Sequence, residues 1–237
     1  AGASEDRVLV STRTAGFAHA SIADGVQMLQ ALGDDDGIGI EASADPARFT
    51  AEELIRFRAV VWLSTTGDVL DAAQQTAFMQ WVEAGGGWVG IHAAADCEYD
   101  WPWFGATLLG GDAWFLSHPA IQSASVVVED PLDASTAHLP PSFDFTDEWY
   151  NFRANPRDAV QVLLRLDESS YAAGSGAMGA DHPIAWKRTL GAGRAWYTGF
   201  GHRAETYTDA RFREHVRGGL RWAMGIEARV FADGFEP

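Results

Sequence analysis

The histidines that follow predicted strands are the residues of this sequence best suited to chemistry. His92 lies in the segment GGGWVGIHAAAD (85–96), in which an apolar run predicts a buried strand and Asp96 returns a carboxylate four residues later. Ligands of open α/β sheets bind at the carboxyl ends of the strands, where a residue on a tight turn presents its side chain, as in a nucleophile elbow. We therefore expect His92 in a functional site, the alternative being a buried structural histidine.

A second strand exit repeats this arrangement further along the chain. In GFGH (199–202) glycines turn the chain before His202, and Glu205 follows three residues later. If the two strands are near neighbours, His92 and His202 face one cleft and Glu205 orients His202. Glu148 stands among aromatic residues in DEWY (147–150), where burial would raise the pKa of its carboxyl and suit it to general acid catalysis. His92, Glu148, His202 and Glu205 are thus the predicted catalytic residues.

Other polar and aromatic residues near predicted strand ends and loops are candidates for binding a substrate. The polar exit STTGD (64–68) contributes Thr66, because backbone N–H groups at such a turn can face a ligand. The chain has ten tryptophans, and we expect some of them to line a cleft as stacking platforms for sugar rings. The predicted substrate-binding residues are His19, Thr66, Asp96, Tyr99, Trp101, His118, Trp149, Asp181 and His182.

Two kinds of chemistry fit such a set of histidines and carboxylates. The groups can act as acid, base and hydrogen-bond donors around a sugar, or they can hold a divalent metal ion. The HExxH motif and paired-cysteine spacings are absent, so the sequence predicts no metal ligand and no cofactor, with a divalent cation as the alternative. His138 and His215 are expected at the surface, and the single cysteine, Cys97, as a half-buried thiol.

Composition limits the classes of partner. A chain of 237 residues with 47% hydrophobic content fits one large α/β domain. The formal charge of −16 opposes binding to nucleic acid or to anionic membrane surfaces, and no run approaches the roughly 20 apolar residues of a membrane span. Nothing in the composition indicates an oligomeric state.

Alternating strand and helix patterns over the first hundred residues predict a right-handed, doubly wound parallel sheet. The strands are expected at 7–13, 38–42, 59–63 and 88–91, and the helices at 21–32 and 71–83. The following part, 99–118, is rich in aromatic residues and glycine and is expected to be irregular. Further strands are expected at 126–129 and 159–166, a hairpin at 184–187 and 194–198, an aromatic insert at 143–152, and a final helix at 210–222.

A series of motifs in order resembles the ThuA-like family, named for trehalose utilisation. After GGGWVGIHAAAD these are EYDWPWF (98–104), SHPAIQ (117–122), DEWYNF (147–152), LLRLDESSY (163–171), MGADHPIAW (178–186), GRAWYTGFGHRAETY (193–207) and FREHVRGGLRWAMG (212–225). The resemblance implies a class I glutamine amidotransferase-like fold, that is, a flavodoxin-like, doubly wound and mostly parallel sheet with helices on both faces. It also implies one domain over 7–226, between an N-terminal tail, 1–6, and a C-terminal tail, 227–237.

The resemblance also bears on activity. Amidotransferases of this fold carry a cysteine at the elbow and a histidine–glutamate pair, whereas this chain has His92 at the elbow, with His202 and Glu205 where the pair would lie. Glutamine hydrolysis should therefore be absent. The family's link to carbohydrate catabolism implies a carbohydrate ligand, and the small-residue start AGASED with the tail VFADGFEP (230–237) favours an exported, periplasmic or extracellular protein. We expect cleavage of a glycosidic bond by hydrolysis or elimination, the alternatives being a non-catalytic sugar-binding module and a metal-dependent hydrolase.

Overall fold

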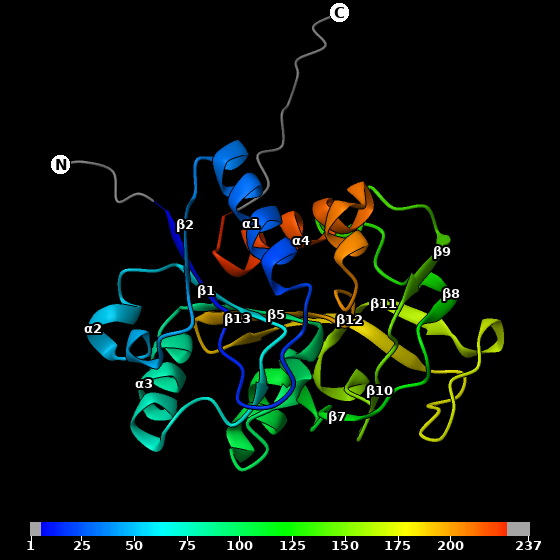
Figure 1. Ribbon diagram of the computed structural model, residues 1–237, viewed down its shortest axis with the longest axis horizontal. Helices are drawn as coiled ribbons and strands as arrows, with labels where there is room; N and C mark the ends of the chain where they lie inside the picture. The colour runs from blue at the N-terminus through cyan, green and yellow to red at the C-terminus, as the bar shows by residue number, and fades with distance from the viewer. Residues whose placement is uncertain (1–5, 227–237) are drawn as a thin grey trace, which may run out of the picture.

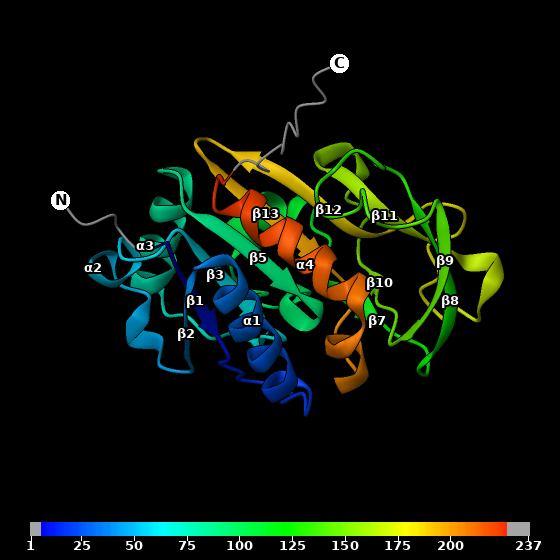
Figure 2. The same cartoon turned by 90° about the horizontal axis from the view of Figure 1, so that it is seen from above.

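A nine-stranded mixed sheet runs through the computed structural model, which describes residues 6–226 (Figures 1 and 2). The predicted tails, 1–6 and 227–237, lie outside the described residues except for Asp6. The strands in sheet order are β2 (Gly39–Ser43), β1 (Arg7–Ser11), β3 (Ala59–Leu63), β5 (Gly87–Ile91), β13 (Gly193–Thr198), β12 (His182–Leu190), β11 (Gln161–Asp167), β8 (Gln122–Val128) and β9 (Ser142–Asp147).

The sheet is parallel in one half and antiparallel in the other. The five strands from β2 to β13 run parallel, and each later neighbour, from β12 to β9, reverses direction. The expected mostly parallel sheet is therefore found over the first half only. β12 is antiparallel to β13 and β11 is antiparallel to β12, so β11 runs in the same direction as β13. In the same way β8 is antiparallel to β11 and β9 is antiparallel to β8, so β9 also runs in the direction of β13. The carboxyl ends of β1, β5, β13 and β9 consequently point to one edge of the sheet.

Helices cover both faces (Figure 1). α1 (Ile22–Asp36) and α4 (Ala210–Ala223) lie on one face, and α2 (Ala51–Leu54) and α3 (Ala72–Glu83) lie on the other. The π-helical turn Phe104–Gly110 packs against β12 and β13. No helix of the described part of the chain is both long enough and apolar enough to cross a bilayer.

Local sequence accounts for the central elements. Every residue of β3 and β5 is buried, as their continuous apolar runs predict for strands covered on both faces. Asp71 caps α3 through a capping box with Gln74, which fixes the predicted start of that helix. The segment 99–118, expected to be irregular, instead contains the turn Phe104–Gly110 and the short strand β7 (Phe115–Ser117), which pairs with β10 (Asn151–Phe152). The aromatic insert 143–152 is mostly β9 and β10.

We expected some of the ten tryptophans to line a cleft, but Trp149, Trp186 and Trp196 belong to the core. The side chains of Trp149, Trp186 and Trp196 are at most 1% exposed. Their indole N–H groups donate to the Gln122 carbonyl, the Leu109 carbonyl and the Ser135 hydroxyl, in that order. Because buried indoles can satisfy their single donor with backbone or hydroxyl acceptors, the number of tryptophans did not indicate a cleft.

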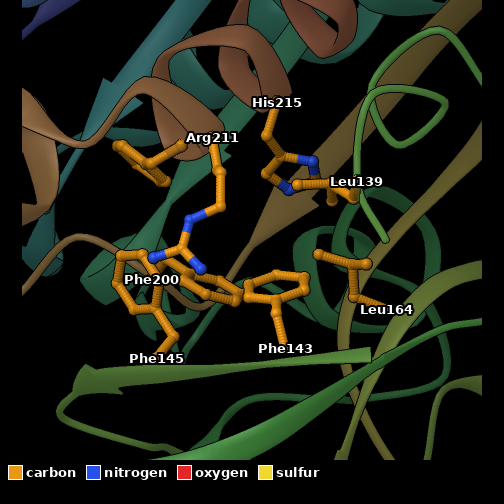
Figure 3. A pocket seen from close by; sticks show the side chains of 8 residues that line it. Leu139, Phe143, Phe145, Leu164, Phe200, Arg211 and His215 are labelled. Carbon is orange, nitrogen blue, oxygen red and sulfur yellow. The ribbon is translucent and has the colours of Figure 1, made fainter. Parts of the chain in front are cut away.

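His215 is buried between α4 and the sheet, so the expectation of a surface residue is wrong for it, whereas His138 is exposed as expected. The Nδ1 of His215 donates to the Ser135 carbonyl, and the Nε2 of His215 accepts from the Thr198 hydroxyl. Figure 3 shows His215 and Arg211 projecting from α4 beside the rings of Phe143 and Phe145, where they line a small apolar cavity. Burial disfavours the charged imidazolium and lowers the pKa of His215 to about 4.

Acid should destabilise the protein through His215. Its pKa is lower in the folded chain than its ordinary value of 6.5, so the unfolded chain binds a proton that the folded chain does not. The contribution of His215 to the free energy of unfolding is complete above pH 6.5. It falls by about 3 kcal/mol as the pH falls towards 4. Urea unfolding at several pH values should show a shallower acid slope for His215→Gln than for the unsubstituted chain, and identical slopes would contradict the assignment.

Candidate metal centre

Three histidines and one glutamate converge at the edge where the strands end. His19 follows β1, His92 follows β5, His202 follows β13 and Glu148 follows β9. One ligand atom from each of them, a ring nitrogen or a carboxylate oxygen, lies within 4.8 Å of the corresponding atom of every other. The structure therefore brings together four residues that are more than 50 positions apart in the sequence, three of them predicted catalytic residues and one a predicted binding residue.

The distances within this cluster suit a single ion. His92 Nε2 lies 3.3 Å from His202 Nδ1 and 3.5 Å from Glu148 Oε2, and His202 Nδ1 lies 3.1 Å from Glu148 Oε2. A tetrahedral ion with ligands at about 2.0–2.1 Å requires ligand atoms about 3.3 Å apart. The three atoms thus have the mutual separations of three corners of such a tetrahedron, with His19 beside them.

His92 is oriented by the backbone on both sides. It takes a positive φ of 51° directly after β5, the sharp strand-to-loop turn expected of an elbow. Its Nδ1 lies 3.0 Å from the carbonyl of Gly199, so Nδ1–H donates there and the Nε2 lone pair faces the cluster. Metal-binding histidines fix their tautomer in this way, through a hydrogen bond from the other ring nitrogen. The ring of Tyr150 packs 4.4 Å from that of His92.

His19 offers a neutral imidazole with an unused nitrogen. Its side chain is 7% exposed, and Nδ1 has no hydrogen-bond partner among the described residues. Burial, together with the neighbouring imidazoles of His92 and His202, lowers the pKa of His19 to about 3, so the ring keeps a free lone pair. A buried nitrogen without a partner is costly, and a metal ion is one partner that would satisfy it.

Thr66 holds the loop that carries His19. Its carbonyl accepts from the backbone N–H groups of Ala15 and Gly16, and its hydroxyl donates to the carbonyl of Phe17. The Thr66 side chain itself is buried. The predicted binding residue therefore acts on the site by positioning the loop of His19.

Glu148 and His202 form the charged part of the cluster. Burial alone would raise the pKa of Glu148, as expected from the sequence, but the contacts with the imidazoles of His202 and His92 outweigh it and lower that pKa. The same contact with Glu148 raises the pKa of His202. The expectation of a raised carboxyl pKa was wrong because two imidazoles face Glu148. Its other oxygen, Oε1, lies 3.2 Å from Nδ1 of His118, whose side chain is 41% exposed.

Asp147 joins the two segments that carry Glu148 and His202. One carboxylate oxygen accepts from the backbone N–H groups of Glu148 and His202, and the other accepts from Gly201 N–H and the Thr206 hydroxyl. Its side chain is fully buried. Asp147 was not predicted as a site residue, because its role depends on β9 lying beside the β13 exit, which no local pattern shows.

Asp96 and Tyr99 lie near the centre as a bonded pair. The Tyr99 hydroxyl donates to Asp96 Oδ1 at 2.5 Å, and the imidazoles of His92 and His118 are close enough to act on the Asp96 charge. Burial nevertheless raises the pKa of Asp96. Asp96 therefore lies near His92, and Tyr99 is joined to the site through Asp96.

Several predicted site residues lie elsewhere. The Glu205 carboxylate is 70% exposed and pairs with Arg203, so the expected contact with His202 is not formed and Glu148 takes that place. Trp101 stacks on Trp103 and Phe104, and Trp149 is in the core. Asp181 pairs with Arg157. His182 is buried and bonded to Glu168 and to the Tyr150 carbonyl, which makes it a structural histidine.

The family model for trehalose utilisation, ThuA, matches residues 7–223. The chain belongs to the ThuA family. No curated protein matches this ThuA chain.

Solved structures agree with the family. A ThuA-like protein from Bacteroides uniformis is similar to this chain with 27% identity and a TM-score of 0.78, over 94% of this chain and 93% of the other. One from Parabacteroides merdae has 19% identity and a TM-score of 0.76, over 94% and 91%. A β-galactosidase from Bacillus circulans has 12% identity and a TM-score of 0.61, over 94% of this chain and 32% of that chain, which is a likeness of fold alone.

Proposed function

We propose that His19, His92, Glu148 and His202 bind one divalent metal ion and that the protein is a metal-dependent enzyme that cleaves a glycosidic bond. The convergence of their four ligand atoms carries the proposal. Two features support it independently, namely the His19 nitrogen that has no partner in the described part of the chain and the tautomer of His92 set by Gly199. Nitrogen ligands with one carboxylate suit zinc and other first-row divalent ions.

A divalent ion held there would supply a Lewis acid for a substrate oxygen or lower the pKa of bound water. The protein groups would do the remaining work. Glu148 Oε2 faces the two imidazoles while Oε1 contacts His118, so His118 is linked to the centre and open to solvent. We assign to His118 the exchange of a proton with the leaving oxygen, and to Asp96, held by Tyr99, the orientation of a sugar hydroxyl.

A carbohydrate substrate is supported by the family's description and by the rim of the site. The ring of Phe17 is 66% exposed and lies 4.9 Å from that of His19, so it offers an apolar face on which a sugar ring could stack.

We also place the fold among flavodoxin-like, doubly wound sheets on the strand order β2-β1-β3-β5-β13. Glutamine hydrolysis is not proposed, because Cys97 is buried and its thiol donates to the Ala94 carbonyl.

A second candidate is cleavage without metal, with His202 and Glu148 as a proton-transfer pair. Their contact at 3.1 Å and the raised pKa of His202 favour it. In that case His92 and His202 would have the acid and base roles expected from the sequence. A metal ion would make these roles impossible, because bound nitrogen lone pairs cannot accept protons.

One experiment separates these functions. Purified protein is incubated with neutral and uronic-acid oligosaccharides, with and without EDTA, and the products are identified by mass. We expect cleavage that EDTA abolishes and zinc or manganese restores. Cleavage that persists in EDTA with no bound metal would establish the second candidate. Protection against heat by a sugar that is never cleaved would leave a binding module.

A further inference from the structure

Arg153 lies near the candidate centre and has no carboxylate partner among the residues that the structure describes. We propose that it binds an anionic group of the substrate, a carboxylate or a phosphate, so that the enzyme acts on acidic sugars. This inference rests on the proposed function, because it assigns the substrate class of the same site.

The guanidinium of Arg153 is held in place by groups that leave its end free. Its Cζ lies 4.3 Å from the centroid of the Tyr99 ring, and its Nε donates to the carbonyl of Phe115 at 3.2 Å. The backbone N–H of Arg153 is fixed by the Trp114 carbonyl. Within residues 6–226, the terminal nitrogens Nη1 and Nη2 have no hydrogen-bond partner and no carboxylate within 4.0 Å, and the residue is exposed.

Two short series of contacts connect this guanidinium with the centre. The Tyr99 ring beneath it ends in a hydroxyl bonded to Asp96, whose charge interacts with His92 and with Arg153 itself. On the other side, the Phe115 ring lies 4.4 Å from that of Tyr150, which packs on His92. Arg153 is therefore two side chains away from a metal-binding candidate by either route.

Arg153 is one of five arginines within residues 6–226 that have no ion pair, the others being Arg13, Arg188, Arg194 and Arg213, and of these five it is the one that stacks on Tyr99 beside Asp96. The chain carries 33 acids against 17 bases, and most of its arginines take one of those acids in an ion pair. The arginines paired in this way are Arg7, Arg48, Arg56, Arg58, Arg157, Arg165, Arg203, Arg211, Arg217 and Arg221. Asp96, beside Arg153, is already bonded to Tyr99.

The contact with Tyr99 involves only the flat face of the Arg153 guanidinium. The N–H groups of Nη1 and Nη2, at the edge of the guanidinium, stay exposed to solvent. A planar fork of N–H donors in a fixed orientation matches a carboxylate or a phosphate and binds it through two parallel hydrogen bonds. A hexuronic acid or a sugar phosphate would then place its acid group on Arg153 while an oxygen of the same or the next ring reaches the centre.

The test is calorimetric titration of the zinc-loaded protein with glucuronate, glucose 6-phosphate and glucose. We expect at least one acid to bind more tightly than glucose, and Arg153→Gln to weaken that acid by roughly 10- to 100-fold with glucose unchanged. Arg153→Lys should fall between, because a point charge replaces the fork. Arg58→Gln, which removes a surface arginine on the far end of β3, should change nothing. A preference for glucuronate identifies a carboxylate substrate, and one for glucose 6-phosphate a phosphate.

The metal content of each variant separates the two proposals. Normal zinc content with equal affinity for acids and glucose, or with an acid affinity that Arg153→Gln leaves intact, would overturn the role of Arg153 alone. Failure of any metal to bind, with the Arg153-dependent preference for acids retained, would overturn the metal centre and keep the anion site.

Discussion

Replacing His92 with asparagine is expected to remove metal binding and turnover while the protein still folds. Asparagine tolerates the positive φ of 51° at this position better than other side chains do, so the backbone turn is kept while the imidazole is lost. Changes to groups that merely orient a metal ligand cost about 10- to 100-fold in affinity, so loss of a ligand should cost more than about 100-fold.

Zinc content and cleavage rate are the measurements for His92→Asn, with circular dichroism and urea unfolding as checks on folding. His138→Asn is the matched control, because His138 is exposed and its one hydrogen bond within residues 6–226 is with the Arg211 carbonyl. A His92→Asn variant that keeps one zinc ion per chain would refute the centre. A variant that loses turnover although neither protein ever binds metal would instead support the acid–base role of His92.

Replacing Asp147 with asparagine should lower both stability and metal affinity. Its buried carboxylate accepts four hydrogen bonds, and an amide nitrogen in place of either oxygen would face two donors. Buried donors left unpaired cost about 1–3 kcal/mol each, so we expect a loss of roughly 3–5 kcal/mol in the free energy of unfolding. Metal affinity should fall by about 10- to 100-fold, because Glu148 and His202 lose their shared anchor.

Asp144→Asn is the control for this variant, because Asp144 lies on the same strand and is exposed. Urea unfolding and zinc titration should leave Asp144→Asn close to the unsubstituted chain. Equal stability of the two variants would show that Asp147 does not hold the two segments together. Lower stability with unchanged zinc affinity would limit Asp147 to a structural role.

The sequence predicted β3, β5 and α3 correctly, because residues within or next to each of these elements determine it. The apolar runs of β3 and β5, the glycines after α3 and the Asp71 cap each act within a few residues, and these elements were found with ends within one or two residues. His92 and His202 were found as candidates because strand exits are visible in the sequence, and Glu148 because it stands among aromatic residues. His92 and His202 meet because β5 and β13 are parallel neighbours, as the expected shared cleft required. The arrival of Glu148 beside them was not predictable, since it depends on four antiparallel pairings that return β9 to the site.

The expected positions of Glu205 and Trp149 beside the site were wrong for one shared reason. Glu205 was chosen for its distance of three residues from His202, but the 3-10 turn Ala204–Thr208 places its carboxylate beside Arg203. Trp149 adjoins Glu148 in the chain, yet its side chain lies in the core. Sequence neighbours were taken as spatial neighbours, whereas the true partner of His202 is 54 positions away.

The four proposed ligands are far apart in the sequence, so binding of the ion requires most of the chain to be folded. His19, His92, Glu148 and His202 come from both halves of the sheet, so only a fragment that spans residues 19–202, most of the domain, holds all of them. A metal ion would bind the folded chain and not the unfolded chain. It would therefore raise the free energy of unfolding in proportion to the logarithm of the metal concentration. In a medium poor in that metal, this ThuA protein would lose activity and resistance to unfolding together.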